Sequence, residues 1–266
     1  MSTKPSAEAV QAASDFLVTL LRDGRHAATI PANLRPHSRS EGYAIQALIE
    51  DQSRQPLRGW KIAATSLAGQ QHINVDGPLA GRLLAERVFP EGVPIALGPN
   101  RMRVAEIEFV FRMGRALPPR PEPYGQSEVL EAVSALHLGV EIPDSRFTDF
   151  VTAGAAQLIA DNACADRFVL GVEVPEIWRD RNLADHRVQG RNTRGLVHDG
   201  RGGNVLGDPR VALTWLANEL SRHGITLDRD QIVTTGTCVT PLAVEPGDRV
   251  TGDYGDFGRI EVRFEP

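Results

Sequence analysis

Residues 104–111 read Val104-Ala105-Glu106-Ile107-Glu108-Phe109-Val110-Phe111, a pattern that predicts a β-strand with one core-facing side. Successive side chains of a strand point to opposite faces, so one face carries only apolar residues: Ala105, Ile107, Phe109 and Phe111. The opposite face carries Glu106 and Glu108 between two valines. Because an ordinary solvated face would be polar throughout, we expect these two carboxylates to lie in a partly buried site.

Two neighbouring negative charges in such a site repel each other unless a cation or a proton relieves them. Magnesium and manganese are suitable cations, since they prefer oxygen ligands in near-octahedral geometry. Glu141 is a candidate third ligand, because it ends another short predicted strand within 139–146 (GVEIPDSR). Three carboxylates leave room on an octahedral ion for a water and for a 2-oxo acid that binds through a carboxylate oxygen and its 2-oxo oxygen.

Spacing alone leaves a second interpretation open. Glu106 and Glu108 could be surface acids on an edge strand, and Glu141 could cap a helix or pair with Arg146. A sequence of two glutamates separated by one residue is a weak signal by itself.

The composition excludes several other classes of protein. The chain has 266 residues and a net charge of -5, with 34 acids and 29 bases and no basic block that would suit nucleic acid. Its two cysteines, Cys164 and Cys238, lie far apart without a CxxC motif, which argues against zinc and disulfides and favours a reducing compartment. No segment is apolar enough to be a signal peptide or a membrane span, so we expect a cytoplasmic protein.

The predicted elements suggest an N-terminal helical region, 1–58, followed by a single catalytic region, 59–266. Apolar residues at helical spacing predict a first helix that ends near Gly24, and Ser38 and Glu41 have capping-box spacing at the start of a second. Two later helices are expected over 127–135 and 208–224. Strands are expected over 60–64, 104–113, 136–142, 168–170, 232–235, 249–251 and 259–264. Strands do not alternate one for one with helices, so the pattern favours an α+β fold with a mixed, strongly curved sheet.

Several motifs in the same order resemble the 2-keto-4-pentenoate hydratase family of the fumarylacetoacetate hydrolase superfamily. They are 59–66 (GWKIAATS), 75–83 (VDGPLAGRL), 106–108 (EIE), 141–146 (EIPDSR), 160–163 (ADNA), 204–209 (NVLGDP), 234–237 (TTGT) and 245–248 (EPGD). The resemblance implies a β-roll of the fumarylacetoacetase C-terminal-like type. It also implies Mg²⁺ or Mn²⁺ on Glu106, Glu108 and Glu141, and a homo-oligomer built from dimers.

The family's typical reaction adds water to a 2-hydroxy-2,4-dienoate, a product of aromatic-ring breakdown, and gives a 4-hydroxy-2-oxo acid. Within this resemblance, Lys61 is a candidate to bind substrate or move a proton, with a pKa lowered if it is desolvated. Without it, a lone lysine would more often be a surface residue. Thr237 is a candidate to bind the substrate carboxylate, or it satisfies a turn.

Further candidates for the substrate pocket are Asp161 and Asn162, whose other possible role is in a turn or cap. Arg82 is either an anion contact or an ordinary surface base. Two positions depart from the family pattern. Leu79 stands where many members have an aspartate, which puts the hydration step in doubt, and Cys164 stands where serine is common, which suggests a different pocket polarity or substrate.

Three alternatives to a hydratase follow. The first is a decarboxylase of a 2-oxo-3-enedioate such as 4-oxalocrotonate, because metal chelation of a 2-oxo group serves both reactions. The second is a non-catalytic partner subunit of a related enzyme, a possibility that Leu79 raises. The third is an acylpyruvate hydrolase, which is disfavoured because His72 and His137 form no obvious His/Glu pair.

Overall fold

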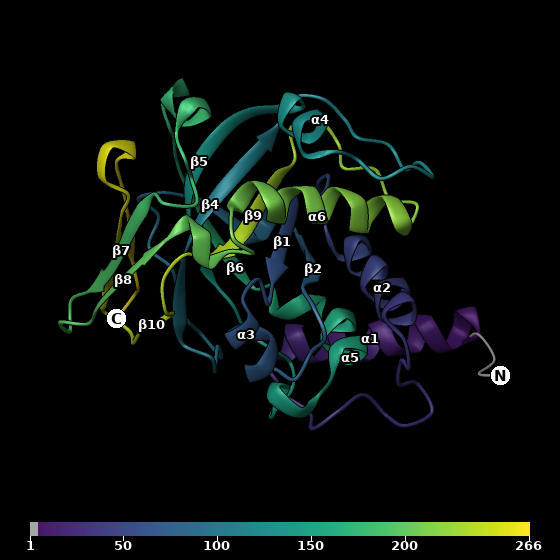
Figure 1. Ribbon diagram of the computed structural model, residues 1–266. Helices are drawn as coiled ribbons and strands as arrows, with labels where there is room; N and C mark the ends of the chain where they lie inside the picture. The colour runs from purple at the N-terminus through teal and green to yellow at the C-terminus, as the bar shows by residue number, and fades with distance from the viewer. Residues whose placement is uncertain (1–4) are drawn as a thin grey trace.

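Eight strands form the main sheet of the computed structural model, which describes residues 5–266 (Figure 1). They are β1 (Gly59–Ala63), β2 (Leu79–Leu83), β3 (Val88–Pro90), β4 (Val104–Met113), β5 (Val133–Ile142), β6 (Arg167–Glu173), β9 (Ile232–Thr237) and β10 (Leu242–Ala243). Their order is β2-β1-β9-β4-β5-β6-β3, and β10 pairs with β4. The pairs β1–β9 and β3–β6 are parallel and the others antiparallel, so the sheet is mixed, as predicted.

A second sheet covers the apolar face of β4. It contains β7 (Arg187–Asn192), β8 (Val197–Arg201), β11 (Arg249–Asp253) and β12 (Arg259–Arg263), in the order β12-β11-β7-β8. The ring of Tyr254, which follows β11, lies 5.1 Å from the ring of Phe109, and its hydroxyl donates to Glu108 O at 2.7 Å. Ile107 and Phe109 are completely buried, which confirms that this face of β4 belongs to the core.

The six α-helices of the described chain are α1 (Ala7–Asp23), α2 (Arg39–Ala47), α3 (Leu67–His72), α4 (Gln126–Glu131), α5 (Ala155–Ala160) and α6 (Pro209–Arg222). Figure 1 shows α1, α2 and α5 gathered at the end of the molecule opposite β7 and β8. The predicted end of α1 and the predicted start of α2 are confirmed. Gly24 ends α1 in the left-handed conformation, at φ 63°, and Ser38 caps α2 by accepting from Glu41 N.

The helix predicted over 127–135 is too long. It ends at Glu131, and β5 begins at Val133, which pairs with Met113 of β4. Pairing with a buried strand therefore overrides the local preference for helix. The sequence also gave no expectation of β2 or of the β7–β8 hairpin. Gly81 interrupts the apolar pattern of β2, and β7 and β8 are rich in polar and charged residues.

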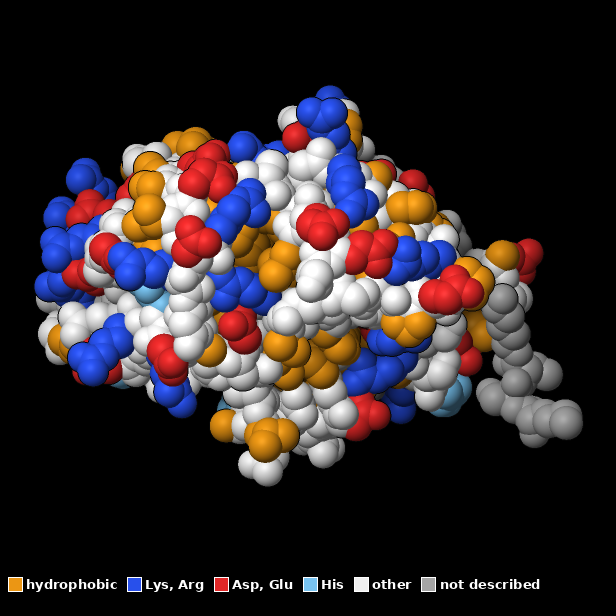
Figure 2. Space-filling model, turned by 45° about the horizontal axis from the view of Figure 1, so that its top comes forward, with side chains coloured by type: hydrophobic (Ala, Val, Ile, Leu, Met, Phe, Trp, Pro, Cys, Tyr) orange, Lys and Arg blue, Asp and Glu red, His pale blue; other side chains and the backbone are white. Residues whose placement is uncertain are grey.

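Acidic and basic side chains are interspersed over the face of the molecule drawn in Figure 2. Within residues 5–266, no helix is long and apolar enough to cross a membrane. The division of the chain at residues 58 and 59 stays a prediction.

Candidate metal centre

Three carboxylates converge on one face of the main sheet. Glu106 pairs directly with Glu141 across β4 and β5, and Glu108 lies two residues further along β4. Residues opposite one another in a sheet share a face, as do residues two apart on a strand. One oxygen atom from each of the three residues lies within 4.8 Å of the others. Glu106 and Glu108, which strand alternation places on one face of β4, thus form one cluster with Glu141 of β5.

Several oxygens of this cluster lack the hydrogen-bond partners that buried carboxylates need. Glu108 and Glu141 are 0% and 1% exposed, and Glu106 is partly exposed. Glu108 Oε2 accepts a hydrogen bond from Gly236 N at 2.8 Å. Within residues 5–266, Glu108 Oε1 and both oxygens of Glu141 have no hydrogen-bond partner. Because unpaired buried charge is unfavourable, this donor set fits a hard divalent cation, which binds through oxygen.

Lys61 reaches the cluster from β1. Its Nζ lies 2.9 Å from Glu141 Oε1, an ion pair whose angle is not that of a hydrogen bond, and it donates a hydrogen bond to Ala163 O at 2.9 Å. In the sheet order, β9 and β4 separate β1 from β5, so the side chain crosses the inside of the curved sheet. Lys61 is 2% exposed, so the interpretation as a surface lysine is wrong.

Burial and mutual repulsion control the pKa values of the cluster. Burial, and then the charge of Glu141, raises the pKa of Glu106 to about 7. Burial and the two other glutamates raise the pKa of Glu108, and burial raises that of Glu141 against the attraction of Lys61. Burial by itself would lower the pKa of Lys61, but the glutamate charges outweigh burial and hold this pKa above its ordinary value. A lowered pKa for Lys61 beside a bound metal ion and substrate stays a prediction.

The metal-free protein should lose stability as the pH rises from 4.5, the ordinary glutamate pKa, to about 7, the pKa of folded Glu106. In this window the unfolded chain has released the proton that folded Glu106 still holds. Raising the pH therefore favours unfolding, by about 1.4 kcal/mol per pH unit for each such carboxyl. Melting temperatures of chelator-treated protein between about pH 5 and 8 measure this slope. Glu106→Gln should flatten it, and an unchanged slope in that variant would contradict the assignment.

Leu79 and Cys164 lie near Lys61. Lys61 pairs with Gly81 and Ala63 pairs with Leu79, so Leu79 is on the face of the sheet that carries Lys61. Leu79 is fully buried. Burial raises the pKa of Cys164 to about 12, so its thiol stays protonated at neutral pH. The two positions that depart from the family pattern thus bring an alkyl group and a neutral thiol to this side of the sheet.

Thr237 lies beside Glu108, its register partner on β9. Its hydroxyl donates to Val239 O at 2.7 Å, which is the turn role considered from the sequence. A contact between Thr237 and a substrate carboxylate stays a prediction.

Arg82 is directed away from the carboxylates. It is 3% exposed, which rules out an ordinary surface base. Its Nε lies 2.5 Å from Glu50 Oε1, and its guanidinium lies 4.6 Å from the centre of the Trp60 ring. Trp60 is next to Lys61 on β1 and therefore points to the opposite face of the sheet.

Asp161 and Asn162 are bound by other parts of the chain. The Asp161 carboxylate accepts hydrogen bonds from Ser145 Oγ at 2.6 Å and Arg146 N at 3.0 Å, and it pairs with the Arg146 guanidinium. The Asn162 carboxamide binds the backbone of Arg82. These contacts fit the turn or cap role considered from the sequence, and a pocket-lining role for the two residues stays a prediction.

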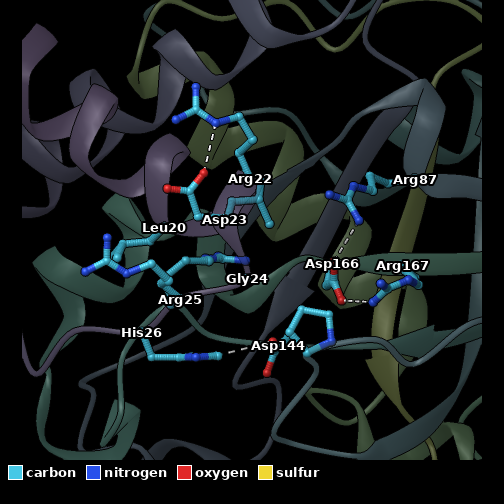
Figure 3. Close-up of a pocket in the computed structure, with 13 residues that line it drawn as sticks. Leu20, Arg22, Asp23, Gly24, Arg25, His26, Arg87, Asp144, Asp166 and Arg167 are labelled. Carbon is cyan, nitrogen blue, oxygen red and sulfur yellow. Dashed lines mark hydrogen bonds and ion pairs between the residues drawn. The ribbon is translucent and has the colours of Figure 1, made fainter.

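A pocket of about 470 Å³ lies elsewhere, between the end of α1 and the segments 144–146 and 166–167. Figure 3 shows Arg87 and Arg167 directed at Asp166, and His26 directed at Asp144. These wall charges largely pair with one another, and the three clustered glutamates are not among the lining residues. We therefore assign no ligand to this pocket.

Known proteins resemble the chain over nearly its whole length. The 2-keto-4-pentenoate hydratase 1 of Dechloromonas aromatica (strain RCB) is 30% identical over 259 residues, which cover 96% of each chain. The chain belongs to the 2-keto-4-pentenoate hydratase family. The TodF product hydratase of Pseudomonas putida (strain F1) is 31% identical over 264 residues, covering 96% of this chain and 95% of the relative.

The fold of this hydratase family member also matches a solved structure. The 4-oxalocrotonate decarboxylase from Pseudomonas putida G7, complexed with magnesium and adipate, superposes with a TM-score of 0.89 at 22% identity, covering 99% of this chain and 100% of that one. This likeness confirms the β-roll fold expected from the sequence. No family model matches the chain.

The structure of this hydratase family member adds residues that the sequence did not single out for the site. Six buried side-chain N or O atoms within 5–266 have no hydrogen-bond partner, and three of these belong to Glu108 and Glu141. Two more, Thr234 Oγ1 and His137 Nε2, lie on the same face of the sheet, since both residues pair with Val110. Finding them required the strand register.

One sequence signal was available and was missed. The chain contains 2 lysines among its 29 basic residues, so the other 27 are arginines. An arginine does not lose its proton in proteins, whereas a lysine can. A buried lysine in a chain that uses arginine almost everywhere else therefore points to a role that arginine cannot fill.

Proposed function

We propose that this protein is a metal-dependent hydratase that adds water to a 2-hydroxy-2,4-dienoate, such as 2-hydroxypenta-2,4-dienoate, and gives a 4-hydroxy-2-oxo acid in aromatic catabolism. Membership of the hydratase family supports the reaction class. The observation that carries the proposal is the convergence of Glu106, Glu108 and Glu141, in which Glu108 Oε1 and both oxygens of Glu141 lack hydrogen-bond partners within residues 5–266. A small dienoic acid needs such a cation site to bind through its carboxylate and its 2-oxygen.

We assign the cation to Mg²⁺ or Mn²⁺, held by the three glutamates. When bound, the ion would withdraw electrons from the substrate's 2-oxygen and stabilise negative charge there. All protein ligands are carboxylates, which suit these hard ions better than zinc or copper. Of Mg²⁺ and Mn²⁺, we favour Mg²⁺ because the 4-oxalocrotonate decarboxylase structure contains magnesium.

We assign proton transfer to Lys61. Hydration requires one proton at the terminal carbon of the diene, C5, while the 2-hydroxyl loses its proton and becomes the 2-oxo group. Water then adds across C3 and C4, with its oxygen on C4 and a proton on C3. Glu141 and the carbonyl of Ala163 hold the Lys61 ammonium on the inner face of the sheet. Its burial excludes bulk water as a competing proton donor. Thr237, beside Glu108, is the proposed contact for the substrate carboxylate.

Decarboxylation of a 2-oxo-3-enedioate is the second candidate. The fold likeness to 4-oxalocrotonate decarboxylase is consistent with it, and Leu79 favours it. An alkyl group on the Lys61 face can neither donate nor accept a proton, so the site has one group fewer for activating water. Hydration remains the leading proposal because the two relatives at 30% and 31% identity that cover nearly the whole chain are hydratases.

Purified protein supplied with Mg²⁺ or Mn²⁺ should consume 2-hydroxypenta-2,4-dienoate, followed as loss of dienol absorbance, without releasing carbon dioxide. A parallel reaction with 2-oxohex-3-enedioate measures carbon dioxide. Carbon dioxide release with no dienoate consumption would replace the hydratase proposal with the decarboxylase. Turnover by the isolated protein on either substrate would dispose of the non-catalytic partner hypothesis.

We also propose a cytoplasmic homo-oligomer built from dimers, in line with the resemblance on which the catalytic proposal draws. Sedimentation analysis of the purified protein measures the subunit number. A single subunit as the main species would contradict this part of the proposal.

A further inference from the structure

β2 is an edge strand of the main sheet. At Arg82, a side chain makes the backbone hydrogen bonds that a neighbouring strand would otherwise make. β2 pairs with β1 along one side. On its other side, Arg82 N donates to Asn162 Oδ1 at 2.6 Å, and Asn162 Nδ2 donates to Arg82 O at 2.8 Å. Asn162 is 4% exposed, so its carboxamide is fully engaged inside the protein. One carboxamide thus satisfies both backbone groups of an edge residue.

Asn162 also begins a strained turn. Asn162, Ala163 and Cys164 all have left-handed backbones, with φ values of 57°, 50° and 61°. Residues with a Cβ rarely adopt this conformation, and three in succession persist only where surrounding contacts hold them. Asp144 N donates to Cys164 O at 2.9 Å from the segment that follows Glu141. The turn is therefore held at both ends, by β2 through Asn162 and by the Glu141 segment through Cys164.

The middle carbonyl of this turn binds the proposed catalytic lysine. Ala163 O accepts the hydrogen bond from Lys61 Nζ at 2.9 Å. The packing around it is close, because a Cβ at Gly81 would lie 2.4 Å from Asn162 O and 3.0 Å from Lys61 Cγ. A shift of the turn would therefore move the carbonyl that holds the ammonium.

We propose that Asn162 is a positioning residue for Lys61: its carboxamide fixes the 162–164 turn against β2, so that Ala163 O holds the ammonium beside Glu141. This inference rests on the proposed function for its catalytic consequence. It assigns Asn162 a different task from substrate binding, since both polar groups of the carboxamide are already bound to Arg82.

Two substitutions test this role. Asn162→Gly removes the carboxamide and tolerates the left-handed backbone, so it separates loss of the contact from strain. Asn162→Asp keeps an acceptor for Arg82 N but has no donor for Arg82 O. We expect kcat to fall about 10- to 100-fold in Asn162→Gly, as for a displacement of about 1 Å, and less in Asn162→Asp. Affinity for Mn²⁺ should not fall, because no metal ligand is altered.

Asn218 of α6 provides the matched control. Its carboxamide makes the same pair of contacts with one backbone residue, accepting from Tyr124 N at 2.7 Å and donating to Tyr124 O at 3.1 Å. Asn218→Asp should lower the melting temperature about as much as Asn162→Asp does, without reducing kcat. An equal loss of kcat in both variants would overturn the proposal, because Asn162 would then act only through general stability.

A second measurement does not depend on turnover. Lys61 and Lys4 are the only lysines in the sequence, so modification by an amine reagent can be followed at Lys61 by peptide mass spectrometry. Metal-free Asn162→Gly should be modified at Lys61 faster than wild type, and Asn218→Asp should not. Equal rates in all three proteins would overturn the positioning role. If wild type hydrates no dienoate, the proposed function fails, and the labelling rates still decide the role of Asn162.

Discussion

Replacing Glu108 with glutamine should lower kcat/KM by at least about 10³-fold, since a metal ion at such a site supplies several kcal/mol to the reaction. The metal affinity should also fall, by more than the roughly 10- to 100-fold cost of changing a residue that only supports a ligand. The reason is local. Glu108 Oε1 is a buried oxygen without a hydrogen-bond partner within 5–266, and glutamine would put an uncharged amide there. Mn²⁺ titration and steady-state kinetics measure the two effects.

The stability of this variant separates a ligand from a structural acid. Glutamine can still accept from Gly236 N through its amide oxygen, as Glu108 Oε2 does. It also removes one of three carboxylates that repel one another, so metal-free Glu108→Gln should melt no lower than metal-free wild type at neutral pH. Unchanged metal affinity in this variant would remove the metal centre from the proposal.

Glu219 of α6 supplies a control, because its replacement by glutamine should change stability and metal affinity in the opposite way. It is also buried, and burial opposes its ionisation, but its contacts with His223 and Arg222 lower its pKa to about 2. Its charge therefore stabilises the folded state at neutral pH. Because its pKa is lowered, this contribution is present above the ordinary glutamate pKa and is lost in acid. Glu219→Gln should melt lower than wild type and bind Mn²⁺ normally.

The sequence was informative about the metal centre because strand alternation is a local rule. Two glutamates one residue apart on a strand must share a face, whatever the strand pairs with. The partnership of Glu106 with Glu141 is not local, since the two residues are 35 positions apart and their pairing depends on the register between β4 and β5. Family resemblance supplied that link, and spacing alone left Glu141 free to be a cap or a partner of Arg146.

The surroundings of Lys61 were beyond sequence reasoning for a related reason. Asn162 reads as a turn or pocket residue, because its contact with Arg82 joins two segments that no periodic pattern connects. The left-handed conformations of Ala163 and Cys164 are likewise imposed by contacts at the ends of the turn and oppose the preference of the residues themselves. A surface base remained one of two interpretations of Arg82, because the strand that aims it at Trp60 was not recognised.

Lys61→Met should lower kcat by about 10²- to 10⁴-fold, the usual contribution of a positioned acid or base, and should raise the affinity for Mn²⁺. Turnover and metal affinity should change in opposite directions because Lys61 has two roles beside the glutamates. As a proton carrier it is needed for turnover. As a cation 2.9 Å from Glu141 Oε1 it competes with the metal for the same carboxylate. Removing a like charge at this range favours metal binding by at least about tenfold, since even at an effective dielectric of ~20 the repulsion exceeds 1 kcal/mol.

Lys61→Arg separates proton transfer from the effect of the positive charge on metal binding. Its guanidinium keeps the positive charge but does not release its proton near neutral pH, so kcat should fall without a gain in metal affinity. If Lys61 were only a counter-ion for the glutamates, bound metal would make it dispensable, and Lys61→Met would retain kcat within about tenfold of wild type. The chain has 27 arginines but a lysine at this buried position. We therefore expect both Lys61→Met and Lys61→Arg to lose turnover, because neither an apolar side chain nor a permanent charge can transfer a proton.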